Sequence, residues 1–168
     1  NGSIPSSLGN LLNLVHLRLS RNKLTGTIPS SLGNAVNLNE ITFNTNSLSG
    51  SLPSSIGKLV KLTYAYFSSN QLIGSLPTTL GNLTSLIVLS LEYNKFSKNI
   101  PSSLSFLTSL QQLYLGYNKL TGKFPTAFGA SGGNLLILSA PYNSLTGSIP
   151  TNLMYLSSLE SVSLNNNQ

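Results

Sequence analysis

The chain has 168 residues, of which 40% are hydrophobic and only 7% are charged, and it contains no Cys. This composition excludes an intrinsically disordered chain, because disordered segments are poor in apolar residues and rich in charge. It also excludes a disulfide framework and a thiolate metal site within these residues, and no apolar run approaches the ~20 residues that an α-helix needs to span a bilayer.

The net charge of +6 at pH 7 does not by itself indicate nucleic-acid binding. Nine Lys and Arg residues are spread along the chain without forming a run, and the aromatic residues are not interleaved with them. A nucleic-acid-binding face needs its cations gathered in a patch or stripe. We therefore expect no nucleic-acid partner, whereas an acidic polymer or an anionic partner protein stays compatible with the charge.

A 24-residue repeat runs through the chain. Its first full copy reads LVHLRLSRNKLTGTIPSSLGNAVN, and each copy begins 24 residues after the previous one, except for one interval of 25. The extra residue falls in 128–133, a stretch of small residues suited to a turn. We expect a single repeat array over residues 1–168, with a partial copy over residues 1–13. The seven copies begin at Leu14, Leu38, Leu62, Leu86, Leu110, Leu135 and Leu159, the last of which is truncated.

The first half of each copy, LxxLxLxxNxL, predicts a short strand. The Leu-x-Leu alternation places Leu17 and Leu19 on one buried face, because side chains alternate across a strand. An Asn then recurs at one position of every copy, where its amide can bond free backbone groups of neighbouring turns. Stacked copies would make these residues an amide ladder. Its members are Asn22, Asn46, Asn70, Asn94, Asn118, Asn143 and Asn167.

The second half of each copy, TGxIPxxLGxL, predicts a turn and a return path. Gly26 and its equivalents suit a backbone with positive φ or a close neighbour. Pro29 and its equivalents fix φ and lack the N–H that a strand ladder needs. The apolar residues that follow, such as Leu32, Ile56 and Leu80, are expected to face inward again from a short helical turn.

The complete pattern, LxxLxLxxNxLTGxIPxxLGNLxx, resembles the plant-type leucine-rich repeat of receptor-like kinases, receptor-like proteins and polygalacturonase-inhibiting proteins, and it covers essentially the whole chain. The resemblance implies an α/β fold, a right-handed leucine-rich-repeat solenoid with a parallel β-sheet on the concave face and short 3₁₀ turns on the convex face. In that family the TGxIP segments often add a second, shorter sheet.

The copies depart from the pattern at a few places. Ala65 and Ala140 replace strand leucines, which predicts thinner core layers in the third and sixth copies. Residues 97–99 and 105–106 replace TGx and Gly-Asn, so we expect the return path of the fourth copy to differ from its neighbours. The family's Cys-containing caps are missing at both ends. The resemblance therefore implies an interior piece of a longer ectodomain, with any membrane contact made by other parts of the parent chain.

No catalytic or metal-binding arrangement is predicted. The one Gly-x-Ser-x-Gly match is centred on Ser131 in the inserted turn, whereas a nucleophile elbow needs a strand before it and a helix after it. The only His, His16, lies four copies away, and the chain has no Asp. Three Glu in separate copies cannot complete a metal site, and no phosphate-binding loop is present. We expect no enzyme activity, no metal and no cofactor.

The variable positions 3, 5, 7 and 8 of LxxLxLxxN point away from the core and form the predicted binding face. Six of the seven Tyr residues fall there, and Tyr93, Tyr117 and Tyr142 form one column in successive copies. Tyr is enriched at recognition sites, although stacked Tyr can also simply stabilise a sheet. The first copy adds a small cationic patch. The predicted ligand-binding residues are Tyr64, Tyr66, Glu92, Tyr93, Gln112, Tyr114, Tyr117, Tyr142, His16, Arg18 and Arg21.

Two further surface features leave alternatives open. A group of Lys residues follows the strands of the fourth and fifth copies. It is compatible with binding to an acidic cell-wall polysaccharide, a ligand that the pectin-linked inhibitors of the family imply. Alternatively, the Lys residues only protect an exposed sheet edge from pairing with other strands. Asn82-Leu83-Thr84 is an N-glycosylation sequon on the convex side and Asn1-Gly2-Ser3 is another, although chance also produces sequons in Asn- and Ser-rich chains. The cationic group comprises Lys95, Lys98, Lys119 and Lys123.

We therefore predict an extracellular or cell-surface scaffold that recognises a protein or peptide through its concave Tyr-rich face. It would be a segment of a receptor-like kinase or receptor-like protein ectodomain, on the apoplastic side of the plasma membrane. The alternatives are an accessory or structural subunit docked in a larger assembly, a secreted polygalacturonase-inhibitor-like protein, and a polysaccharide- or ice-binding protein. Pairs such as Ser30-Ser31 and Thr78-Thr79 would suit a regular crystalline surface and are also ordinary for the motif.

Overall fold

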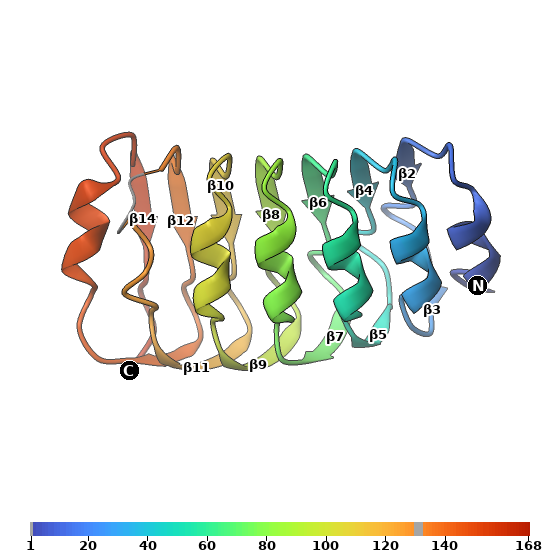
Figure 1. Cartoon of the computed structure of the whole chain (residues 1–168). Helices are drawn as coiled ribbons and strands as arrows, with labels where there is room; N and C mark the ends of the chain where they lie inside the picture. The colour runs from blue at the N-terminus through green and yellow to red at the C-terminus, as the bar shows by residue number, and fades with distance from the viewer. Residues whose placement is uncertain (1, 130–132) are drawn as a thin grey trace.

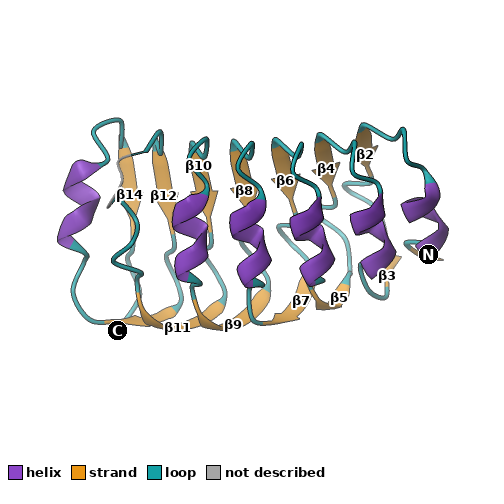
Figure 2. Ribbon diagram, viewed as in Figure 1, coloured by secondary structure: helices purple, strands orange, loops and turns teal. Residues whose placement is uncertain are grey.

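The computed structural model describes residues 2–129 and 133–168. Ser131, the centre of the Gly-x-Ser-x-Gly match, and Asn1, the start of the terminal sequon, lie outside these residues. The chain winds into a row of similar coils, and its two ends lie at opposite ends of the row (Figure 1). Most coils pass through a strand, a turn and a short helix, so the molecule has a strand side, a helix side and a lower edge (Figure 2).

The strand side is one parallel sheet of seven strands in the order β14-β12-β10-β8-β6-β4-β2. Adjacent strands pair 24 residues apart, as in His16 with Glu40, and the pair Gln112 with Ile137 absorbs the one 25-residue interval. The middle residue of a strand, such as Leu89, is directed into the core and fully buried. The strands are β2 (His16–Arg18), β4 (Glu40–Thr42), β6 (Tyr64–Tyr66), β8 (Val88–Ser90), β10 (Gln112–Tyr114), β12 (Ile137–Ser139) and β14 (Ser161–Ser163).

A second parallel sheet runs along the lower edge of the coils (Figure 2). Its strands pair 22 residues apart, as in Ser49 with Gln71, or 23 apart across the 25-residue interval, as in Thr121 with Ser144. Each pairing is therefore two residues shorter than the corresponding pairing in the first sheet. Where its strands turn toward the helix side, Gly26 has a φ of 76°, a conformation that costs Gly little. The five joined strands are β5 (Ser49–Ser51), β7 (Gln71–Gly74), β9 (Lys95–Asn99), β11 (Lys119–Lys123) and β13 (Ser144–Thr146), and β1 (Gly2–Ser3) pairs with β3 (Leu24–Thr25).

The helix side consists of five-residue 3₁₀ helices, each preceded by a Pro in extended conformation. Pro29, for example, has a φ of −70° and comes directly before η2, where its missing N–H leaves no unpaired donor. The predicted inward residues Leu32, Ile56 and Leu80 are fully buried. The helices are η1 (Ser6–Asn10), η2 (Ser30–Asn34), η3 (Ser54–Lys58), η4 (Thr78–Asn82), η5 (Ser102–Phe106) and η6 (Thr151–Tyr155).

Neighbouring 3₁₀ helices approach closely because each of the first four carries a Gly at its fourth position. A Cβ atom built on Gly57 would lie 2.4 Å from the Thr79 carbonyl oxygen, a distance that no side chain can occupy. Side-chain hydroxyls also join neighbouring helices. The Thr79 hydroxyl donates a hydrogen bond to the Ser54 carbonyl at 2.7 Å, and the Ser55 hydroxyl donates one to the Ser30 carbonyl at 2.6 Å. The second hydroxyl of each Ser-Ser or Thr-Thr pair therefore holds consecutive coils together.

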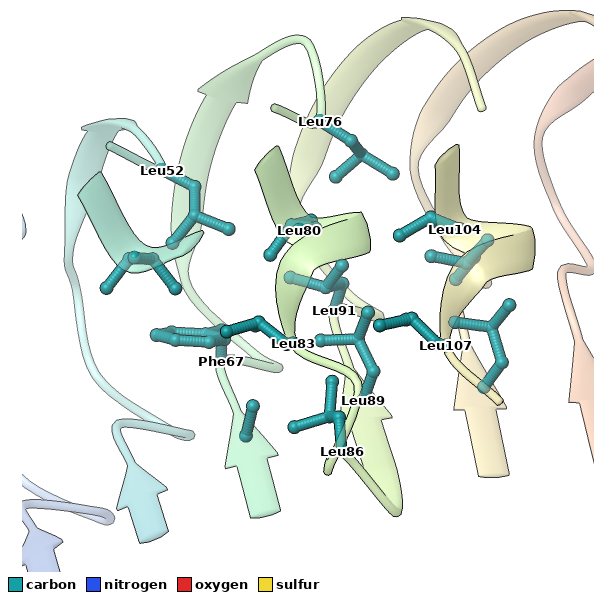
Figure 3. Packing of buried hydrophobic residues seen from close by; sticks show 14 of the residues in the cluster. Leu52, Phe67, Leu76, Leu80, Leu83, Leu86, Leu89, Leu91, Leu104 and Leu107 are labelled. Atoms are coloured by element: carbon teal, nitrogen blue, oxygen red, sulfur yellow. The ribbon is translucent and has the colours of Figure 1, made fainter. Parts of the chain in front are cut away.

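The core is one continuous apolar cluster that passes through every coil. Figure 3 shows Leu80 and Leu83 from the helix side directed into the same interior as Leu89 and Leu91 from the strand side. Ala65 is fully buried, as expected, but its layer is not thin. The neighbouring inward position holds Phe67, which is fully buried and meets Phe43 edge-on with ring centroids 5.8 Å apart.

The expectation of a different return path in the fourth copy is wrong. Helix η5 forms as in the neighbouring coils, and Lys98 adopts the left-handed conformation, with a φ of 68°, that Gly holds elsewhere. The departure lies one coil later, where residues 126–129 form a turn in place of a 3₁₀ helix. Ser105 stands in η5 where the earlier helices have Gly, and the coil that follows also contains the 25-residue interval.

The predicted Asn ladder is confirmed. The Asn94 amide nitrogen donates to the carbonyls of Phe67 and Leu91 at 3.0 and 3.2 Å, and its oxygen accepts the Leu72 N–H at 3.0 Å. Each bond to Phe67 or Leu72 joins two consecutive coils. The parallel sheets, the 3₁₀ helices and this ladder together confirm the predicted solenoid fold.

Candidate functional site

The strand face is the side of the seven-stranded sheet that points away from the core. Its positions 3 and 5 are the first and last residues of each strand, and the strand pairing places equivalent positions side by side. Tyr64 and Gln112 therefore flank Val88, and Tyr66 and Tyr114 flank Ser90.

Aromatic side chains cover the middle of the strand face. Val88 and Ser90 are only 5% and 4% exposed although they point outward, which the sequence analysis did not foresee. Burial raises the pKa of Tyr66, and the nearby Tyr64 and Tyr114 raise it further. The Tyr114 hydroxyl donates to the Gln112 side-chain oxygen at 3.1 Å. These residues form a continuous surface of rings and polar tips.

The Tyr column (Tyr93, Tyr117 and Tyr142) forms a stack along the edge of the strand face. The ring centroids of Tyr93 and Tyr117 are 4.2 Å apart, those of Tyr117 and Tyr142 are 4.5 Å apart, and the rings are within 16° of parallel. All three side chains are exposed, by 49%, 39% and 47%. The contact with the Tyr93 hydroxyl raises the pKa of Tyr117, with a smaller contribution from burial.

The Tyr column also stands on an unusual backbone. Position 8 is left-handed in every copy, with φ between 52° and 60°. This conformation costs a residue with a Cβ roughly 1–2 kcal/mol, although Asn tolerates it. Asn166 occupies this position in the seventh copy, whereas the column places three bulky rings there.

The cationic patch predicted for the first copy is smaller than expected. Glu40, which was not among the predicted site residues, lies in register with His16. Its carboxylate accepts a bifurcated hydrogen bond from the Arg18 Nε atom, 3.0 Å from each oxygen, and a second hydrogen bond from Arg18 Nη2. The His16 Nδ1 atom lies 3.3 Å from the same carboxylate. The hydrogen bond to Arg18 holds the pKa of Glu40 below its ordinary value. The sequence could have predicted that Glu40 lies beside His16, because the two residues occupy position 3 in consecutive copies.

Glu92 lies at position 7, between the covered strand positions and the Tyr column. Its backbone carbonyl accepts the Ser69 N–H at 3.0 Å, and the Tyr93 N–H donates to the Gly116 carbonyl, so Ser68 and Gly116 are its neighbours in the column. The side chain is half-buried, and burial raises the pKa of its carboxyl. Within residues 2–129 and 133–168, this carboxylate has no hydrogen bond and no ion pair.

The remaining predicted features lie elsewhere on the surface. The four Lys residues of the cationic group are exposed and lie on β9 and β11 of the second sheet. Asn82 is exposed at the end of η4 on the helix side, and Arg21 is exposed at position 8 of the first copy. In the described part of the chain, no three His, Cys, Asp or Glu side chains gather to hold a metal ion, and no helix is long and apolar enough to cross a bilayer.

Solved structures of plant receptor ectodomains share this fold. The ectodomain of the receptor kinase GASSHO1/SCHENGEN3 from Arabidopsis thaliana, in complex with CASPARIAN STRIP INTEGRITY FACTOR 2, is 39% identical with a TM-score of 0.94, over 99% of this chain and 20% of that one. The ectodomain of the Arabidopsis receptor kinase HAESA, in complex with an IDA peptide hormone, is 38% identical with a TM-score of 0.93, over 99% of this chain and 28% of that one. The chain thus spans less than a third of these ectodomains.

A plant ice-binding protein also has this fold. It is 29% identical with a TM-score of 0.82, over 100% of this chain and 62% of that one. No curated protein matches the chain. The family described as "Leucine-rich repeat region" matches residues 3–141, which is most of the sequence. With its parallel strand face, its Asn ladder and this match, the chain belongs to the leucine-rich repeat family.

Proposed function

We propose that this chain is an extracellular recognition module that binds a peptide or protein segment along the strand face of its third to sixth copies. The Tyr column carries the proposal. Three exposed rings occupy a backbone conformation that disfavours them, at a cost of about 1 kcal/mol or more each. Ring stacking offsets part of this cost, at about 0.5–1.5 kcal/mol per pair. Exposed aromatic residues gathered on one face are typical of recognition surfaces.

The solved neighbours support a peptide ligand. The HAESA and GASSHO1/SCHENGEN3 ectodomains are described in complex with peptide or protein factors. Both match this chain over nearly its full length. On this proposal the parent protein is a receptor-like kinase or receptor-like protein at the cell surface.

The alternatives are less well supported. An ice-binding surface on the helix side would have only one hydroxyl of each pair, because the Ser31, Ser55 and Thr79 hydroxyls donate to carbonyls of the preceding coil whereas Ser30, Ser54 and Thr78 stay exposed. The cationic group on β9 and β11 favours an acidic polysaccharide as a second ligand, and polygalacturonate binding that is lost on changing Lys95 and Lys119 to Gln would support it.

The experiment replaces all three residues of the Tyr column by Asn, which tolerates the left-handed backbone and already stands at this position as Asn166. Peptides are first selected from a random library on the unchanged chain. Because stacked rings at a recognition surface act as hot spots, the triple variant should bind the selected peptides at least about tenfold more weakly. Isothermal titration calorimetry measures the affinity, and circular dichroism checks the fold.

The matched control places Asn at Ser30, Ser54 and Thr78, which are exposed on the helix side. This control should bind like the unchanged chain. Failure to select any peptide, or equal affinity in the Tyr column variant, would refute the proposal.

A further inference from the structure

The three acidic residues of this chain have different surroundings. Glu40 is paired with Arg18 and His16. Glu160 is exposed just before β14 in the seventh copy. Glu92 alone is half-buried on the strand face, and it has no hydrogen-bonding or ionic partner in the described ranges.

The two neighbours of Glu92 in its column are smaller than Glu92, and the Pro141 ring lies against Gly116. Position 7 holds Ser68 in the preceding copy and Gly116 in the following one, so Glu92 is the largest side chain in this part of the column. Position 7 lies between position 5, which pairs Ser90 with Tyr114 of the next copy, and position 8, which is Tyr93. A half-buried carboxylate on a face that also carries exposed Tyr rings is a suitable site for a cation, because the carboxylate supplies charge and ring faces attract cations as well.

We propose that Glu92 binds a Lys or Arg side chain of the peptide ligand, and so fixes the register of that peptide along the strand face. This inference rests on the proposed peptide-binding function. A ligand cation would provide the partner that the half-buried carboxylate lacks, which is why it would favour one position of the peptide. The chain carries a net charge of +6, so this selectivity comes from a local site and not from overall attraction.

The test uses the same random peptide library on four chains: the unchanged chain, Glu92→Gln, Glu92→Lys and the control Glu160→Gln. The unchanged chain and the control should enrich peptides with Lys or Arg at one fixed position. Glu92→Gln should lose this preference, and Glu92→Lys should replace it by Asp or Glu. A selected basic peptide should bind Glu92→Gln about tenfold or more weakly, as expected for a desolvated charge pair.

A double-mutant cycle separates a direct contact from a change in folding. Replacing the basic residue of the peptide by Gln should weaken binding to the unchanged chain but have little further effect on Glu92→Gln. Because burial raises the pKa of Glu92, its ionisation destabilises the fold as pH rises through that pKa. Glu92→Gln should therefore be at least as stable as the unchanged chain at pH 7, and no more stable than it below the ordinary carboxyl pKa.

The outcomes separate the two proposals. Selected peptides that depend on the Tyr column but show no basic preference, or that bind Glu92→Gln equally well, would overturn the Glu92 assignment alone. Failure to select peptides on the unchanged chain would overturn the proposed function itself, and the Glu92 assignment with it.

Discussion

At the residue scale, each copy places an Asn side chain next to backbone N–H and C=O groups that need hydrogen-bond partners. Asn94 is 8% exposed and bonds the backbone of two coils, whereas Asn22 in the first copy is exposed and bonds only the Leu19 and Ser20 carbonyls of its own coil. The same residue type therefore contributes differently along the stack. Its contribution depends on whether a preceding coil is present to accept its amide protons.

Replacing Asn94 by Ala should lower the free energy of unfolding by about 1–3 kcal/mol, because buried backbone groups of two coils lose their partner. The same change at Asn22 should have a much smaller effect, since water can replace its bonds. Urea denaturation followed by circular dichroism measures both. Equal losses at the two positions would show that the ladder does not hold adjacent coils together.

At the element scale, the spacing of the 3₁₀ helices depends on one Gly per helix. Gly9, Gly33, Gly57 and Gly81 each lie within 2.4 Å, measured from a built Cβ, of a carbonyl oxygen in the next helix. Ser105 breaks this series, and the following coil has a turn instead of a helix. The first four helices can therefore pack this closely only because each lacks a side chain at its fourth position.

Gly57→Ala should destabilise the chain by about 1–3 kcal/mol, as expected when a methyl group is forced into a packed contact. The matched control is Ser105→Ala, at a position that already carries a Cβ, where the change should stay within about 0.5 kcal/mol. Thermal unfolding of the two variants beside the unchanged chain gives the comparison. A neutral Gly57→Ala would mean that η3 and η4 can move apart freely.

At the scale of the whole molecule, the faces of the solenoid have separate roles. The strand face carries the Tyr residues and Glu92, the second sheet carries the cationic group, and the helix side carries the sequon at Asn82. Because Asn82 is exposed at the end of η4, a glycan there would extend away from the strand face. Glycosylation at this site and ligand binding on the strand face are therefore compatible.

We propose that Asn82 is glycosylated when the chain passes through a secretory pathway. The secreted chain should show a glycan mass by mass spectrometry that peptide N-glycosidase removes, and Asn82→Gln should lack it. Peptide affinity should be the same for both chains. A secreted chain without a glycan at Asn82 would contradict the assignment, and a loss of affinity in Asn82→Gln would contradict the separation of the two faces.

The sequence by itself determined the strands, the buried Leu positions, the Asn ladder and the outward direction of the Tyr residues. The same pattern occurs in all seven copies, so each copy predicts the same local structure. Coils with the same structure stack in the same way, and the stacking therefore follows from the repeat. Gly26 and Pro29 illustrate this, since their backbone preferences are properties of the single residue.

Only the tertiary structure decided what happens between neighbouring coils. The pairing of Glu40 with Arg18, the covering of Ser90 and the stacking of the Tyr rings all depend on side chains from different copies. So does the lack of a partner for Glu92 in the described residues, which distinguishes it from Glu40. The physical reason is distance: residues about 24 apart in sequence lie one strand spacing apart in space, ~4.8 Å, and only the folded chain shows which of their side chains meet.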